Sequence, residues 1–102
     1  MEKYKCREFT STGNLFLPSK WGKEFHIEFG TKVDIEYDSE VIYIRKANPN
    51  STCNKRLVSE KNTVLIPKEI RDNANISTEK EYCLYIDKRN KQFVIAIQEE
   101  AS

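Results

Sequence analysis

The chain has 102 residues, the length of one small domain. Charged residues make up 32% and hydrophobic residues 38%, which is polar for a globular domain, but aromatic and β-branched residues are too common for wholesale disorder. The formal net charge of +1 gives no global electrostatic reason to expect nucleic acid or a membrane as partner, so any basic surface must come from segregation of charge.

The chain carries no obvious targeting signal. No apolar run approaches the length needed to span a bilayer, and the N-terminal residues lack the hydrophobic core of a signal peptide. We therefore expect a cytoplasmic protein without membrane contact. Cys6, Cys53 and Cys83 are widely spaced and, together with His26, match no metal-ligand spacing. We expect three reduced structural thiols, no metal and no cofactor.

Residues 3–10 open the chain with an alternating pattern. Tyr4 and Cys6 face one way and basic residues face the other, which predicts a half-buried strand with one basic face. A turn follows at residues 11–14, because Gly13 and Asn14 tolerate positive φ.

Two apolar stretches, residues 15–17 and 64–66, each end at a proline, Pro18 and Pro67. Proline disfavours the helical conformation for the residue before it and suits the first turn of a helix. Each stretch therefore predicts a short strand that leads at once into a helix. The two helices are expected at residues 18–25 and 67–74.

The hairpins and the linker follow from alternation and turn residues. Residues 32–37 alternate strictly and predict a strand, which a tight connection joins to a returning strand at 41–44. The polar residues 48–53 form a linker between a first unit, 1–47, and a second unit, 54–102. In the second unit we expect strands at 55–59, 63–66, 82–86 and 93–97, with a longer charged loop at 87–91.

The two units share a period of 49 residues, the spacing of Pro18 and Pro67. The order of the elements, the positions of the turns and the positions of the apolar residues agree at this offset. His26 and Asn75 fall at equivalent helix ends, and both tolerate the left-handed conformation that ends helices. We therefore expect His26 to be a structural cap or surface residue.

Nothing in the sequence indicates an enzyme. There is one histidine, no arrangement typical of nucleophilic catalysis and no glycine-rich phosphate loop. Asp34, Glu36 and Asp38 lie on an alternating strand, where we expect them to form its solvated face.

Charge is segregated within each unit. The strand-turn-helix part carries a local excess of basic residues, and the hairpin part carries an excess of acidic ones. One face of the folded protein would then be basic and suited to phosphate groups, although mixed charges that merely solvate a polar surface are the alternative.

The unit of strand, turn, strand-Pro, short helix and hairpin resembles the swapped-hairpin family of AbrB and MazE. The resemblance is carried by residues 13–18, 25–27 and 29–33 in the first copy, and by residues 62–71 and 74–76 in the second. It implies a mostly β fold with two short helices: a swapped-hairpin β-barrel built as an intrachain pseudo-dimer of two ββαββ units. The tandem arrangement also resembles the MraZ branch of this family.

The resemblance further implies a transcriptional regulator that binds double-stranded DNA through its strand-turn-helix face. The residues expected at that face are Lys5, Arg7, Asn14, Lys20, Lys23, Lys55, Arg56, Lys61, Lys68 and Arg71. The partners considered also include a second copy of the chain, in a dimer of pseudo-dimers. The alternatives are an antitoxin with a toxin partner, and a protein-interaction or assembly module that has lost DNA binding.

Overall fold

The fold is described from a computed structural model that covers residues 1–98; residues 99–102, the end of the predicted second unit, lie outside the described residues. It is mostly β with two short helices, as predicted. The elements in chain order are β1 (Glu2–Glu8), β2 (Asn14–Phe16), α1 (Ser19–Glu24), β3 (Lys32–Asp38), β4 (Val41–Lys46), β5 (Asn54–Leu57), β6 (Thr63–Leu65), α2 (Lys68–Asn73), β7 (Glu81–Asp87) and β8 (Gln92–Ile97).

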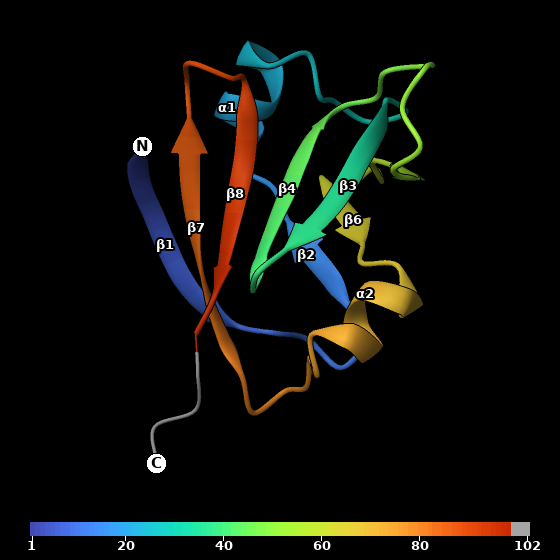
Figure 1. Ribbon diagram of the computed structural model, residues 1–102. Helices are drawn as coiled ribbons and strands as arrows, with labels where there is room; N and C mark the ends of the chain where they lie inside the picture. Colours follow the sequence, from blue (N-terminus) through green and yellow to red (C-terminus); the bar gives the residue numbers. More distant parts are fainter. Residues whose placement is uncertain (99–102) are drawn as a thin grey trace.

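Six strands form an antiparallel sheet in the order β1-β7-β8-β4-β3-β5, and β2 pairs with β6 in a separate two-stranded ladder (Figure 1). The first strand of each half pairs with the hairpin of the other half: β1 with β7, and β5 with β3. The two hairpins meet where β4 pairs with β8. Figure 1 shows α1 and α2 at opposite ends of the molecule.

Backbone hydrogen bonds between the halves repeat at the 49-residue offset. The Leu17 N–H donates to the Asn62 carbonyl at 2.8 Å, and the Ile66 N–H donates to the Gly13 carbonyl at 2.9 Å. Gly13 and Asn62 both have positive φ, +79° and +58°, as their turns require. Each turn therefore extends the β2–β6 ladder with a bond to the other half.

The helices begin as the prolines predict, one residue later than expected. Pro18 and Pro67 are extended at ψ 125° and 141° and stand before the first helical residue. Each proline carbonyl accepts the N–H four residues on, at 2.9 and 3.0 Å. At the other end, His26 and Asn75 have φ of 58° and 53°, which confirms the predicted left-handed helix ends.

The hydrophobic core is a cluster to which both halves and both sheets contribute. Leu15 and Val64 of the ladder pack with strand residues of the large sheet. Phe25, which follows α1, meets Phe93 of β8 edge-on with ring centroids 5.5 Å apart. Residues distant in sequence therefore share the burial of apolar surface that stabilises the fold.

Two expectations for β1 were wrong. All seven of its residues are exposed rather than half-buried, because β1 is an edge strand that, within residues 1–98, pairs with β7 alone. Its Cys6 is not a free thiol: it lies directly opposite Cys83 of β7, and the two form a disulfide. Cys53 is free, as predicted.

Candidate nucleic-acid interface

The β2–β6 ladder organises the candidate site. Leu15 pairs with Val64, and both side chains are buried. Because side chains alternate along a strand, the neighbouring positions face outward. Phe16 and Leu65 are exposed by 38% and 39%, so the outer surface of the ladder presents apolar as well as polar groups.

Arg7 reaches this ladder from β1. Its guanidinium carbon lies 5.4 Å from the centroid of the Phe16 ring, a cation–π contact at the end of β2. Arg7 is also opposite Tyr82 in the β1–β7 register. Burial raises the pKa of Tyr82, and the positive charge of Arg7 opposes that shift. Arg7 is thus a positive group held beside an exposed aromatic ring.

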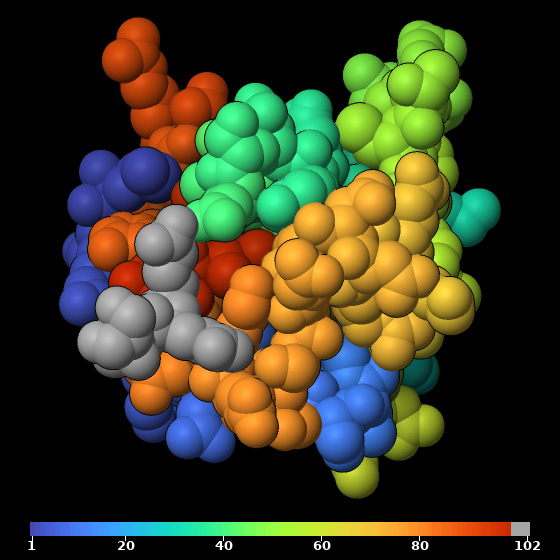
Figure 2. Space-filling model, turned by 60° about the horizontal axis from the view of Figure 1, so that its bottom comes forward, coloured from blue at the N-terminus to red at the C-terminus, as the bar shows by residue number. Residues whose placement is uncertain are grey.

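Arg71 lies on α2, and its side chain contacts the other end of β2, where the strand begins. Its aliphatic and guanidinium atoms pack so closely on Gly13 that a Cβ there would lie 2.8 Å from the Arg71 Cδ. The Arg71 Nε is buried and has no hydrogen-bond partner within residues 1–98. Figure 2 shows α2, in gold, directly beside the segment that leads into β2, in blue. An arginine from each half therefore flanks β2.

The other predicted residues of the first half are exposed or partly exposed. Lys5 lies on the edge strand β1, and Lys20 and Lys23 lie on α1. The Asn14 amide donates to the Thr12 hydroxyl at 3.0 Å within the turn. Asn14 therefore shapes the turn that precedes β2.

In the second half, Lys61 and Lys68 are exposed, but their surroundings differ. Lys61 lies in the turn between β5 and β6, whereas Lys68 pairs with Asp72 at 3.0 Å on the surface of α2. An exposed ion pair of this kind is weak, so Lys68 can exchange Asp72 for another anion.

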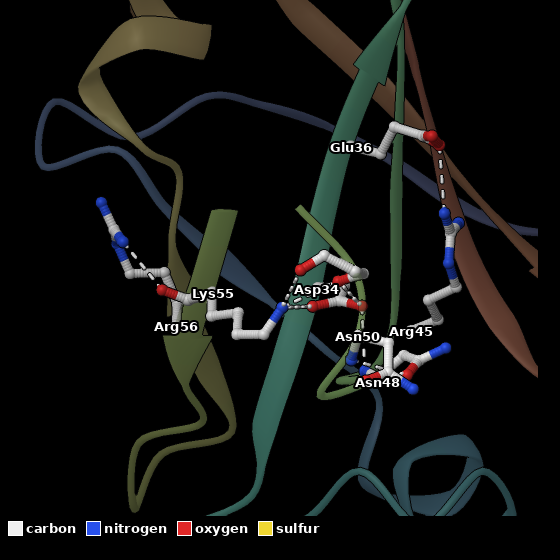
Figure 3. Close-up of polar contacts among 8 residues, drawn as sticks. Asp34, Glu36, Arg45, Asn48, Asn50, Lys55 and Arg56 are labelled. Atoms are coloured by element: carbon white, nitrogen blue, oxygen red, sulfur yellow. Dashed lines mark hydrogen bonds and ion pairs between the residues drawn. The ribbon is translucent and has the colours of Figure 1, made fainter. Parts of the chain in front are cut away.

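Lys55 and Arg56 on β5 point in different directions and are engaged within the protein (Figure 3). The Lys55 ammonium donates to Asp34 Oδ1 at 2.8 Å and to the Ser51 hydroxyl at 2.7 Å. Arg56 Nη1 donates to the Lys55 carbonyl at 2.8 Å. The two predicted phosphate contacts on β5 are thus partly buried, and Lys55 is already neutralised by a carboxylate.

The prediction that Asp34 belongs to a solvated acidic face was wrong. It is 1% exposed, because β3 lies between β4 and β5 and the linker folds over it. The Asn48 N–H and the Ser51 hydroxyl donate to its Oδ2 at 3.0 and 2.8 Å. Burial by itself would raise the pKa of Asp34, but the hydrogen bonds from Lys55, Asn48 and Ser51 outweigh it and lower the pKa.

The structure places Arg7, Asn14 and Arg71 around β2. Lys20 and Lys23 lie on α1, which Figure 1 shows at the opposite end of the molecule from α2, the helix that carries Arg71. The sequence predicts residues 87–91 only as a charged loop, yet this loop brings the Lys88 ammonium within 4.9 Å of the centroid of the Trp21 ring. No local pattern signals this contact, because it depends on which hairpin packs beside α1.

Within residues 1–98, no three His, Cys, Asp or Glu side chains are grouped so that they could hold a metal ion. No helix of that part of the chain is both long enough and apolar enough to cross a bilayer.

No family model and no curated protein matches the chain. Among solved structures, the chain is similar to one described as the solution structure of PHS018 from Pyrococcus horikoshii, with a TM-score of 0.51 and 19% sequence identity. The similarity covers 99% of this chain and 96% of that chain. At this identity the likeness shows a shared fold alone.

Proposed function

We propose that the protein is a DNA-binding transcriptional regulator of the AbrB-like type, and that its chain is an intrachain pseudo-dimer of two swapped-hairpin units. The observation that carries the proposal is the pair of arginines, one from each half, at the two ends of β2. Arg7 lies over Phe16 and Arg71 packs on Gly13. Guanidinium groups fixed in this way are suited to phosphate oxygens and to base edges.

The pairing of strands supports the pseudo-dimer. Each half supplies its first strand to the hairpin of the other half, and β2 pairs with β6 across the two halves. Neither half can form these ladders by itself. Joining the halves in one chain replaces a bimolecular association with an intramolecular one of high effective concentration.

Duplex binding tests the proposal. Fluorescence anisotropy with labelled duplexes, including DNA from upstream of the gene, should show affinity that falls steeply between about 50 and 200 mM salt. Replacing Arg7 and Arg71 by alanine should weaken binding and reduce the magnitude of the salt slope by about 1 to 2.

The matched control is K32A/K46A, which removes the same charge from exposed positions on β3 and β4. It should change affinity by less than about two-fold at moderate salt, since only long-range attraction is lost. If wild-type protein binds no duplex at low salt, or if both double variants lose affinity equally, the proposed interface is wrong.

Exposed apolar side chains favour assembly as a second candidate function. Phe29 and Leu57 are exposed by 64% and 60%, in addition to Phe16 and Leu65 on the ladder. Large exposed apolar groups are typical of protein–protein contacts when they are contiguous. A discrete higher oligomer by light scattering, which F29S/L57S converts to a monomer and which ignores DNA, would favour this function over the first.

A further inference from the structure

The two ends of the molecule are equivalent in topology but differ in charge. At one end α1 meets the β7–β8 loop (Figure 1), and at the other α2 lies beside the β3–β4 hairpin (Figure 2). The cations of the first end are Lys20, Lys23, Lys88, Arg89 and Lys91, with Glu24 as the acidic residue among α1 and loop residues 88–91. The second end carries Lys68, Glu69, Arg71 and Asp72 on α2 and Glu40 in the turn.

An aromatic ring lies at the centre of the basic end. Trp21 is half-buried on α1, and the ammonium groups of Lys20 and Lys88 lie 5.2 and 4.9 Å from its ring centroid. Trp21, Lys88 and Lys91 line a hollow together with Glu24 and Phe25. The equivalent position of α2 is Ile70, which is buried and presents no ring.

The loop that supplies Lys88 and Lys91 is held in place by Asp87. Its carboxylate accepts the Asn90 N–H at 3.2 Å, the Asn90 amide at 2.9 Å and the Gln92 amide at 3.0 Å. Lys91 adopts a positive φ of 51° within this loop. The cations are therefore carried by an ordered turn on a rigid hairpin.

From this arrangement we propose that the α1 end is a binding site for single-stranded nucleic acid, with an unpaired base stacked on Trp21 and phosphates bound by Lys20, Lys88 and Lys91. Stacking on an aromatic ring is stronger than an exposed cation–π contact, so a base can displace the two ammonium groups from the ring. The displaced lysines are long and flexible, and they then pair with the adjacent phosphates.

Two carboxylates reduce the positive charge of the site but do not prevent phosphate from binding. Lys88 lies 3.6 Å from Glu2 in an exposed pair, and Glu24 lines the hollow. Exposed pairs of this kind exchange readily for phosphate. The site shares no side chain with the Arg7 and Arg71 interface, so it can be tested whether or not duplex DNA binds there.

Trp21 is the single tryptophan of the chain, so its fluorescence reports on this site directly. Titration with an oligothymidylate of about twelve nucleotides should quench the fluorescence with saturation at low salt. An abasic oligonucleotide of the same length should bind more weakly, by about ten-fold, and quench little. A duplex of equal length should also quench little, because its bases are already stacked.

Variants separate the site from general electrostatics. By anisotropy of the labelled oligothymidylate, K88A/K91A should lose about ten-fold in affinity, whereas K32A/K46A, which removes equal charge elsewhere, should lose less than about two-fold. Trp21→Phe should retain binding better than Trp21→Leu, with the melting temperature of each variant recorded to exclude unfolding.

The inference is wrong if oligothymidylate leaves the fluorescence unchanged, or if the abasic strand or the duplex binds and quenches as well as oligothymidylate does. Equal losses for K88A/K91A and K32A/K46A would also overturn it. Loss of duplex binding in R7A/R71A together with intact quenching by oligothymidylate would show two independent sites.

Discussion

Asp34 and Glu36 stand two residues apart on β3, and each carries an ion pair. The pair of Asp34 with Lys55 is 2.8 Å long, and its carboxylate side chain is 1% exposed. The pair of Glu36 with Arg45 is 3.0 Å long, with side chains exposed by 41% and 35%. The same strand therefore offers, for comparison, an ion pair whose carboxylate is buried and an ion pair whose carboxylate is exposed.

Asp34→Ala should lower the free energy of unfolding by about 3 kcal/mol, because it leaves the Asn48 N–H, the Ser51 hydroxyl and Lys55 without their shared acceptor. Glu36→Ala, the matched control, should cost less than about 1 kcal/mol, since water screens its pair. Urea unfolding measures both. Equal costs would show that the Asp34 contacts are not stabilising.

Acid should destabilise the protein through the same carboxylate and through Asp87. The pKa of Asp34 lies below its ordinary value of 3.8, and side-chain hydrogen bonds from Asn90 and Gln92 likewise lower that of Asp87. Because the folded pKa values are the lower ones, their stabilisation is complete well above pH 3.8 and is lost as the pH falls through the lowered values. Unfolding free energies measured between neutral and acid pH should show this loss. D34N and D87N should each make the decrease of the unfolding free energy with falling pH smaller. If both variants lose as much unfolding free energy at acid pH as the wild type does, the loss does not come from Asp34 and Asp87.

At the scale of the element, the two helix ends differ in how well their residue suits a left-handed backbone. His26 and Asn75 have nearly the same φ, but asparagine tolerates this conformation better than histidine. His26→Gly should therefore raise the free energy of unfolding by about 0.5 to 1 kcal/mol, and Asn75→Gly by less. Thermal unfolding of both variants tests this, and a larger gain at Asn75 would contradict the reasoning.

The edge strand β1 depends on a covalent link. It buries none of its residues, and Cys6 joins it to Cys83 across 77 positions of sequence. Removing a link that closes so long a loop increases the entropy of the unfolded chain.

The double variant C6S/C83S should lower the free energy of unfolding by about 2 to 4 kcal/mol. Cys53→Ser should have little effect on stability, because Cys53 has no disulfide partner. Unfolding of the wild type with and without a dithiol reductant gives the same comparison without mutation. If reduction leaves stability unchanged, β7 alone holds β1.

At the scale of the whole molecule, the two halves are interdependent. Both halves contribute strands to the large sheet, where each hairpin lies between two strands of the other half, and Phe25 packs on Phe93 across the division. Residues 1–47 and residues 54–102, expressed separately, should therefore lack cooperative unfolding by circular dichroism. Mixed in equal amounts, they should recover the native spectrum. A half that folds cooperatively by itself would refute the pseudo-dimer.

The sequence by itself determined those features of this fold that depend on conformational preferences of neighbouring residues. Proline geometry gives the strand-to-helix transitions at Pro18 and Pro67, and tolerance of positive φ gives the left-handed ends at His26 and Asn75. Alternation and short apolar stretches located the strands, and the predicted mostly β class followed from them. Each of these features depends on residues only a few positions apart.

Only the tertiary structure decided what surrounds each side chain. Alternation placed Asp34 on a solvated face, but the pairing of β3 with β5 and the path of the linker bury it. Composition predicted free thiols, but the register of β1 on β7 sets Cys6 opposite Cys83. Likewise, α1 gains Lys88 as a neighbour of Trp21 through the hairpin of the other half. These contacts join positions dozens of residues apart, and strand order and register, which no local pattern encodes, determine them.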